Sequence, residues 1–277
     1  MEVIIRPNAE SAAELAVDFI ARELLAKPDA VLGLATGRTM EEVYRRLVQR
    51  HLSAGLDFSR CRTFNLDEYV GLTADDPNSY RYFMRDRLFC HVNIDESRTH
   101  LPNGVAQNLE AECRHYEKLI SENGGIDLLL LGIGLNGHLG FNEPYSGFDT
   151  KTRVTPLTEA TRNQNALLFS HPDRVPQSAV TMGIATILEA RHCLLLATGK
   201  EKAAIVAQAI AGPITTSVTA SALQWHPACT VILDEAAASS LQELHHGNGK
   251  HFTQNTAGRQ PALASPLASL APIRLKM

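Results

Sequence analysis

Short apolar segments alternate with amphipathic helical segments along most of this chain, and this alternation constrains its fold more than any other feature. Several apolar segments contain no polar residue, as expected for strands that are buried on both faces of a sheet. The candidate strands are residues 3–5, 31–34, 62–65, 127–131, 192–197 and 230–233. The pattern predicts an α/β fold with a mainly parallel sheet that helices cover on both faces.

Helical periodicity fills the intervals between these segments. Residues 11–25 carry apolar side chains at spacings of three and four residues, and a second such pattern begins at Thr39. Ser11 with Glu14, and Thr39 with Glu42, have the spacing of capping boxes, in which two side chains close a helix N-terminus. Further helices are predicted over residues 79–88, 109–122, 202–211 and 235–244.

Two segments lack this regular alternation. Residues 145–177 are polar and loop-like, and we predict a mobile lid over about residues 145–180. Residues 245–277 are rich in Gly, Pro, Ala and Ser without a sustained period, and we predict a loosely ordered C-terminal extension there. Residues 1–244 are then expected to form a single α/β domain.

Composition and charge exclude several classes of protein. The 277 residues include 26 Lys and Arg against 30 Asp and Glu, a formal charge of -4, so no basic excess attracts nucleic acid or acidic lipid. No apolar run approaches the roughly 18 residues of a membrane helix, and the N-terminus lacks a secretory pattern. Five scattered cysteines without a CxxC pair are typical of reduced thiols in a cytoplasmic protein. A small molecule is the expected partner, and the sequence leaves a homo-oligomer open.

The first candidate site is the turn at residues 33–39, between a predicted strand and a predicted helix. Backbone amides at a helix N-terminus bind anions, phosphate above all, and small residues let the ligand approach. Arg38 adds a fixed cation. The segment is neither a Walker loop nor a GxGxxG motif, so an ordinary strand-to-helix turn stays an alternative.

The second candidate site follows the predicted strand 62–65. Asp67 and Glu68 would project beyond the carboxyl end of this strand, where open α/β sheets bind their ligands. One of the two can then serve as a general base. Two acids at such a place are also common in a solvated turn or a helix cap.

The third candidate site is the most informative. Residues 132–144 directly follow an apolar strand and contain four glycines, with Asn136, His138 and Glu143 among them. Glycines permit backbone conformations that bring such side chains together, histidine carries a proton near neutral pH, and a carboxylate can orient it. A glycine-rich loop with an incidental histidine is the alternative. No Cys, His and acidic residues have metal-ligand spacing, and no GxSxG motif supports a serine hydrolase.

Together these motifs resemble the glucosamine-6-phosphate deaminase family, whose members are also called glucosamine-6-phosphate isomerases. The resemblance covers roughly residues 1–240 and is carried by GLATGRT, FNLDEYVGL, LGIGLNGHLGFNEP and TRVTPLTEATR. It implies a modified doubly wound α/β fold and a reaction that needs neither a metal nor an organic cofactor. Glucosamine 6-phosphate and water would become fructose 6-phosphate and ammonia, a hydrolase or isomerase activity of amino-sugar catabolism.

The resemblance also implies a role for each candidate residue. Asp67 corresponds to the base that removes the C2 proton of the opened sugar to give an enolamine. His138 corresponds to the histidine that opens the pyranose ring, Glu143 to the carboxylate that holds this histidine, and Asn136 stands where some members have an aspartate. An asparagine can orient the histidine but cannot share its charge. The implied phosphate ligands are Thr36, Gly37, Arg38, Thr39 and Lys202.

Departures from the family pattern keep other activities open. Some members bind the phosphate with an arginine where this chain has Leu167, and we hypothesise that Arg38 replaces that charge. Because of Leu167 and Asn136, a galactosamine-6-phosphate deaminase stays an alternative. 6-Phosphogluconolactonases share the fold and a similar loop. A non-catalytic sugar-phosphate sensor would need a DNA-binding module, which none of the predicted elements supplies.

Overall fold

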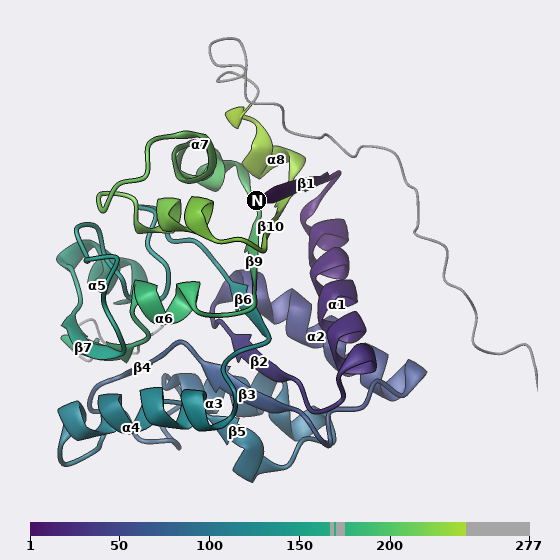
Figure 1. Ribbon diagram of the computed structural model, residues 1–277, viewed down its shortest axis with the longest axis vertical. Helices are drawn as coiled ribbons and strands as arrows, with labels where there is room; N and C mark the ends of the chain where they lie inside the picture. Colours follow the sequence, from purple (N-terminus) through teal and green to yellow (C-terminus); the bar gives the residue numbers. More distant parts are fainter. Residues whose placement is uncertain (167–168, 170–174, 242–277) are drawn as a thin grey trace, which may run out of the picture.

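Seven parallel strands form the central sheet in the computed structural model, which describes residues 1–166, 169 and 175–241 (Figure 1). All neighbouring strands pair in parallel. Every residue of three strands is buried, and because alternate side chains point to opposite faces, both faces of the sheet are covered. The expected α/β class is confirmed. In spatial order the strands are β1 (Glu2–Arg6), β10 (Cys229–Asp234), β9 (His192–Ala197), β6 (Leu128–Leu131), β2 (Val31–Leu34), β3 (Arg62–Asn65) and β5 (Thr99–His100).

The strand order reverses beside β2. From β2 the chain proceeds outward to β3 and β5, and then returns to β6 on the other side of β2 before it continues to β9 and β10. In such sheets, ligands bind beyond the carboxyl ends of the strands at the point where the order reverses. The first and third candidate motifs follow β2 and β6, so they lie beside each other at this point.

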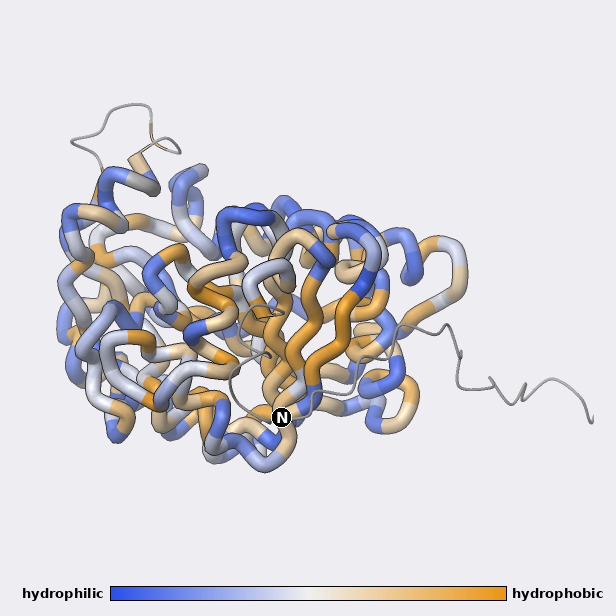
Figure 2. The backbone as a smooth tube through the Cα atoms, turned by 90° about the horizontal axis from the view of Figure 1, so that it is seen from above, coloured by the Kyte–Doolittle hydropathy of each residue, from blue (hydrophilic) through white to orange (hydrophobic). Residues whose placement is uncertain are grey.

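The six predicted strands are all present, and their ends lie within one residue of the prediction. The sequence pattern missed β5, whose two residues are too few to show a period. Hydrophobic strands lie in the interior, and hydrophilic residues gather on the surrounding helices and turns (Figure 2). None of the described helices combines the length and apolar character that crossing a membrane requires.

The predicted helices are also present, although one is shorter than expected. The C-terminal helix was predicted over residues 235–244, but α8 ends at Ala238; residues 242–277, with the predicted extension at 245–277, lie outside the described residues. The short helix α6 was not predicted. The helices are α1 (Ala9–Ala26), α2 (Arg38–Ala54), α3 (Tyr80–Arg87), α4 (Leu109–Glu122), α5 (Glu159–Ala166), α6 (Ile184–Leu188), α7 (Ala203–Ala211) and α8 (Glu235–Ala238), with 3-10 turns η1 (Phe89–His91), η2 (Glu96–Arg98), η4 (Lys200–Lys202) and η5 (Thr219–Trp225).

The predicted cap of α1 was wrong by one turn. Asn8 is the N-cap, and it closes a capping box with Ser11, whose backbone N–H donates to the Asn8 side chain at 2.8 Å. Glu14 instead forms an ion pair with Arg46 of α2 at 2.5 Å. An asparagine at the N-cap satisfies the same backbone donors as a serine would.

The predicted cap of α2 was also wrong. The N-cap is Gly37, and no side chain caps this helix, so Thr39 and Glu42 do not form a capping box. Glu42 lies in ion pairs with Arg45 and Arg46, at 2.7 and 2.6 Å. The first backbone N–H groups of α2 therefore keep free hydrogen-bonding capacity for a ligand.

A second, smaller sheet corrects the prediction for residues 145–177. Strands β4 (Asp67–Tyr69), β8 (Ser178–Thr181) and β7 (Arg153–Pro156) pair antiparallel, with β8 in the centre. The segment therefore contains a strand and the helix α5 rather than loop alone. The sequence hides the strand because burial does not follow hydrophobicity there: the polar Thr155 is buried, whereas the apolar Val154 is exposed. In Figure 1, α5 and α1 lie on opposite sides of the molecule. That this segment is a mobile lid stays a prediction.

Candidate active site

The turn after β2 places the N-terminus of α2 at the carboxyl edge of the central sheet. Gly37 has φ 108°, a left-handed conformation that favours glycine, and it lies at the N-cap of α2. Two side chains fix the backbone of the turn by hydrogen bonds. The buried Asn65 amide donates to the Leu34 carbonyl at 2.7 Å, and the Tyr44 hydroxyl donates to the Ala35 carbonyl. Arg38 is exposed at the first position of the helix. A helix N-terminus without a side-chain cap can accept an anion, and that a phosphate binds here stays a prediction.

Lys202 of η4 lies against the glycine-rich segment at the same edge of the sheet. Its ammonium donates to the carbonyl of Ile133 in the glycine-rich segment at 2.7 Å, which leaves two protons for a ligand. The preceding Gly132 lies against the first turn of α2, where an added Cβ would be 3.3 Å from Met40 Cε. Burial lowers the pKa of Lys202. The structure thus brings the glycine-rich segment close to both Lys202 and the beginning of α2.

Asp67 is a buried carboxyl group that opens the short strand β4. It is 5% exposed, and within the described part of the chain no donor forms a hydrogen bond with its side chain. Burial, aided by the negative charge of the neighbouring Glu68, raises the pKa of Asp67 to about 8. A carboxyl group of this kind can accept a proton near neutral pH.

Glu68 has a structural role instead. Its carboxylate accepts the backbone N–H groups of Tyr69, Tyr80 and Arg81 at 2.8, 3.0 and 2.9 Å. Two of these donors are the first residues of α3, so Glu68 satisfies the start of that helix. Of the two acids in the motif, Asp67 is the one with a carboxylate free for chemistry.

The glycine-rich segment brings Asn136, His138 and Glu143 together. Nδ1 of the imidazole lies 3.7 Å from Oε2 of Glu143, too far for a hydrogen bond but within the range of an ion pair once His138 is protonated. Asn136 forms no hydrogen bond with the imidazole: its amide N–H donates to Glu143 Oε2 at 2.8 Å, and its amide oxygen accepts the backbone N–H of His138 at 3.2 Å. Asn136 therefore holds the carboxylate and the loop rather than the ring.

Glu143 differs from Asp67 in its surroundings. Burial raises the pKa of Glu143, but its contacts with His138, Thr161 and Asn136 outweigh burial. Together they lower the pKa to about 2. The carboxylate is therefore ionised at every working pH. A fixed negative charge beside an imidazole stabilises the imidazolium that forms when the ring takes up a proton.

Two glycines of the segment make room for the reactive groups. An added Cβ at Gly134 would lie 2.3 Å from His138 Nε2, so the imidazole occupies the space that any side chain there would need. At Gly140, which has φ 57°, a Cβ would lie 3.0 Å from Asp67 Oδ2. Gly134 therefore lies against the imidazole of His138, and Gly140 lies beside the carboxylate of Asp67.

Two buried threonines belong to the site and were missed by the sequence prediction. Thr161 of α5 donates its hydroxyl to Glu143 Oε1. Thr181 of β8 pairs with Asp67 across the small sheet, and its hydroxyl accepts the backbone N–H of Phe141 at 3.1 Å. Thr161 lies within TRVTPLTEATR, which carried the family resemblance but indicated no role for this residue, and Thr181 lies in no recognised motif. The fold therefore reveals both contacts. Leu167, where the family pattern has an arginine, lies outside the described residues.

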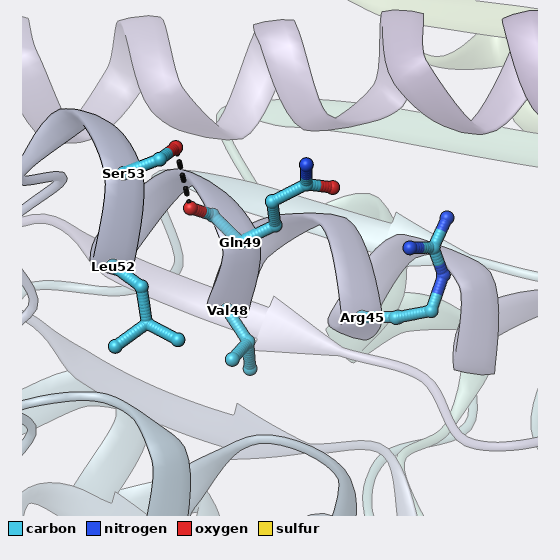
Figure 3. Close-up of a pocket in the computed structure, with 5 residues that line it drawn as sticks. All are labelled: Arg45, Val48, Gln49, Leu52 and Ser53. Atoms are coloured by element: carbon cyan, nitrogen blue, oxygen red, sulfur yellow. Dashed lines mark hydrogen bonds between the residues drawn. The ribbon is translucent and has the colours of Figure 1, made fainter.

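A hollow on α2 is separate from this site. Figure 3 shows that it is lined by residues of the later turns of the helix, whereas the turn at residues 33–39 lies at its beginning. At a rise of 1.5 Å per residue, its first residue is roughly 10 Å along the axis from Arg38. The hollow is lined by Arg45, Val48, Gln49, Leu52 and Ser53.

Within residues 1–166, 169 and 175–241, no three His, Cys, Asp or Glu side chains group as metal ligands.

Comparisons with known proteins agree with this geometry. Residues 7–237 match the family model described as glucosamine-6-phosphate isomerases/6-phosphogluconolactonase. A glucosamine-6-phosphate deaminase from Geobacillus sp. (strain WCH70) is 51% identical over 243 residues, which are 88% of this chain and 97% of the relative.

Solved structures of a deaminase and of a 6-phosphogluconolactonase have a similar fold. A monomeric glucosamine-6-phosphate deaminase aligns with a TM-score of 0.85 and 48% identity, over 87% of this chain and 100% of the other. A 6-phosphogluconolactonase from Trypanosoma cruzi aligns with a TM-score of 0.70 but only 24% identity, over 87% and 96% of the two chains, and so shares the fold alone. The chain belongs to the family of glucosamine-6-phosphate isomerases and 6-phosphogluconolactonases.

Proposed function

We propose that this protein converts glucosamine 6-phosphate and water into fructose 6-phosphate and ammonia. The observation that carries the proposal is the pair of buried carboxyl groups with opposite surroundings: Asp67 has no hydrogen-bond donor among the described residues, and Glu143 lies beside His138. An aldose-to-ketose conversion needs one base at C2 and a separate acid–base group at the ring oxygen. The identity of about half the aligned residues with a deaminase supports this reading.

The sugar phosphate is bound at the beginning of α2. The backbone N–H groups that follow Gly37 and the hydroxyls of Thr36 and Thr39 face a phosphate, and Lys202 supplies a positive charge. Arg38 supplies a second positive charge, in place of the arginine that some family members have in the lid. Because the whole chain has a formal charge of -4, these local cations, and not the overall field, attract the phosphate.

Ring opening is the task of His138. The imidazole moves the proton between the C1 hydroxyl and the ring oxygen, and the ionised Glu143 stabilises its charged form. Asn136 keeps the Glu143 carboxylate in place. The product of this step is the open-chain amino aldehyde.

Proton removal at C2 is the task of Asp67. The ammonium group of the substrate lies on the same carbon, and its positive charge favours the ionised form of the Asp67 carboxyl group. Asp67 takes the C2 proton to give an enolamine and returns a proton to C1, which gives an imine at C2. Water then adds to the imine, and ammonia leaves.

Ammonia release is the direct test of this proposal. The enzyme should release ammonia from glucosamine 6-phosphate, and both Asp67→Asn and His138→Gln should lose most of this activity. Hydrolysis of 6-phosphogluconolactone without ammonia release from either amino sugar would favour the lactonase alternative instead. Faster turnover of galactosamine 6-phosphate would assign the enzyme to that epimer, whereas a sugar-phosphate sensor would bind its ligand without turnover.

Two further points are part of the proposal. The relative of 48% identity is described as monomeric, so we propose that this chain also needs no partner subunit for its active site, although a homo-oligomer is compatible with the reaction. A cytoplasmic location is proposed from the cysteine pattern of the sequence.

A further inference from the structure

Helix α5 contacts the surroundings of both carboxyl groups. Thr161 donates its hydroxyl to Oε1 of Glu143, and Asn165 donates its amide to the hydroxyl of Tyr69 at 2.8 Å. These two residues are four apart, so they lie on one face of the helix. That face is therefore turned toward the site, with one polar contact to the glycine-rich segment and one to β4.

The contact of Thr161 fixes the orientation of the Glu143 carboxylate. Oε1 is held by Thr161, and Oε2 accepts the Asn136 amide and faces His138. The Thr158 hydroxyl donates to Thr161 Oγ1 at 3.1 Å, which leaves the proton of Thr161 for Glu143. Without the Thr161 hydroxyl, only one oxygen of the carboxylate would be held, and Oε2 could rotate away from the imidazole.

The contact of Asn165 fixes the strand that carries Asp67. Tyr69 lies two residues after Asp67 in β4, so both side chains lie on the same face of this strand. The Tyr69 ring is 1% exposed and packs against Phe141, with ring centroids 5.4 Å apart. The Tyr80 hydroxyl also donates to the Tyr69 hydroxyl, at 3.4 Å. Removing the Asn165 amide would loosen the face on which Asp67 lies.

We propose that Thr161 and Asn165 are positioning residues for different steps of the reaction. Thr161 orients Glu143 for ring opening, and Asn165, through Tyr69, positions Asp67 for proton removal at C2. The inference rests on the proposed function and extends it, because it assigns to one helix the alignment of both halves of the site.

The two steps can be measured separately. Ammonia release from glucosamine 6-phosphate needs ring opening as well as proton removal. With fructose 6-phosphate and ammonium in D2O, an imine forms at C2, and Asp67 can exchange a C1 proton for deuterium. The imine forms from the open-chain ketose that is in equilibrium with the furanose in solution, so no pyranose ring has to be opened. The exchange therefore reports the Asp67 step without the Glu143 step.

Thr161→Val removes the hydroxyl and keeps the shape of the side chain. We expect kcat for ammonia release to fall about tenfold or more, since a hydrogen bond to a charged group is lost, with KM little changed. Deuterium exchange at C1 should stay within about twofold of the wild type, and Thr161→Ser should restore ammonia release. Equal loss of both activities, or no loss of ammonia release, would overturn the assignment of Thr161.

Asn165→Leu and Tyr69→Phe remove the two partners of the other contact. We expect each to lower ammonia release and deuterium exchange together, by about fivefold, as for one neutral hydrogen bond. The double variant should be no worse than Tyr69→Phe alone, because the Asn165 amide has no contact with Tyr69 left to lose once the Tyr69 hydroxyl is gone. Additive effects, or loss of ammonia release with normal exchange, would overturn the assignment of Asn165.

Controls separate these outcomes from misfolding and from failure of the proposed function. Thr73→Val removes an exposed hydroxyl and should leave both activities unchanged. Thr161→Ala provides a second variant without the hydroxyl, which should show the same pattern if Thr161→Val does not fold. If the wild type releases no ammonia, the proposed function fails; if it does and the variants lack the expected pattern, only this inference fails.

Discussion

Asp67 and Glu143 are both buried carboxyl groups of one site, yet their surroundings are opposite. They are 5% and 6% exposed. Asp67 lies on a strand with a negative neighbour and no donor among the described residues, so its pKa rises to about 8. Glu143 lies in a loop, where its contacts with His138, Thr161 and Asn136 outweigh burial and lower its pKa to about 2.

This difference teaches that the surroundings of an acid decide its role. A carboxyl group that gains or loses a proton near neutral pH can act as a base, whereas one that is always ionised can only orient and stabilise a cation. The exposed fraction alone does not separate the two cases, because it is nearly the same for both groups. The hydrogen-bond donors and the charges around each carboxylate do, together with the deeper position of Asp67 in the protein.

The largest expected effect comes from Asp67→Asn. The amide keeps the shape of the side chain but cannot accept the C2 proton, so kcat for ammonia release should fall by about a thousandfold, within the usual range for a general base. Steady-state kinetics with glucosamine 6-phosphate measures this. Asp29→Asn, an exposed acid in the turn before β2, is the matched control and should have normal activity. If Asp67→Asn keeps a tenth of the activity, Asp67 is not the base.

Gly134→Ala should have the next largest effect. The new methyl group would occupy the position of the imidazole, so His138 must move and kcat should fall about a hundredfold. Proton exchange at C1 of fructose 6-phosphate should be retained, because Gly134 is on the histidine side of the site. Gly140→Ala, which crowds Asp67 Oδ2, is the counterpart and should lower both activities. Identical patterns for the two variants would contradict the division of the site.

Arg38→Ala tests phosphate binding apart from both carboxyl groups. Loss of a charge-assisted contact should raise KM for glucosamine 6-phosphate about tenfold, with kcat little changed. A KM equal to that of the wild type would rule out Arg38 as the replacement for the missing lid arginine.

The smallest expected effect is on stability. Folding raises the pKa of Asp67, so the folded state binds more protons than the unfolded state between the unfolded pKa, near 3.8, and about 8. Stability from this residue is complete below the unfolded pKa and is lost as the pH rises through about 8. Asp67→Asn should therefore be the more heat-stable protein at pH 9, by at least about 2 °C in Tm, with the difference vanishing near pH 4. Thermal unfolding at both pH values measures this, and a constant difference would contradict the raised pKa.

The sequence was informative where local patterns determine structure. Buried strands such as 31–34 and 192–197 have continuous apolar runs, and their positions were predicted correctly. Asn8 was missed as a cap because Ser11 and Glu14 offer the same spacing one turn later. The strand at Arg153–Pro156 was missed because its buried residue is the polar Thr155 and its pairing with β8 is not local.

The site was predictable only in part for a similar reason. Asp67, His138 and Glu143 lie in distinctive motifs that follow strands, so sequence reasoning and family resemblance indicated them. Thr161 lies 18 residues beyond Glu143 and contacts it only because α5 folds back over the glycine-rich segment. The opposite surroundings of the two acids depend on such contacts, and no local pattern encodes them.

The division of labour between the two carboxyl groups is tested most directly by deuterium exchange at C1 of fructose 6-phosphate, in D2O with ammonium, for His138→Gln and Asp67→Asn side by side. We predict that His138→Gln exchanges at nearly the wild-type rate although it has lost most ammonia release from glucosamine 6-phosphate, and that Asp67→Asn exchanges at less than about a hundredth of that rate. Loss of exchange in His138→Gln to the same extent as in Asp67→Asn, or normal exchange in Asp67→Asn, would contradict the separation of the two steps.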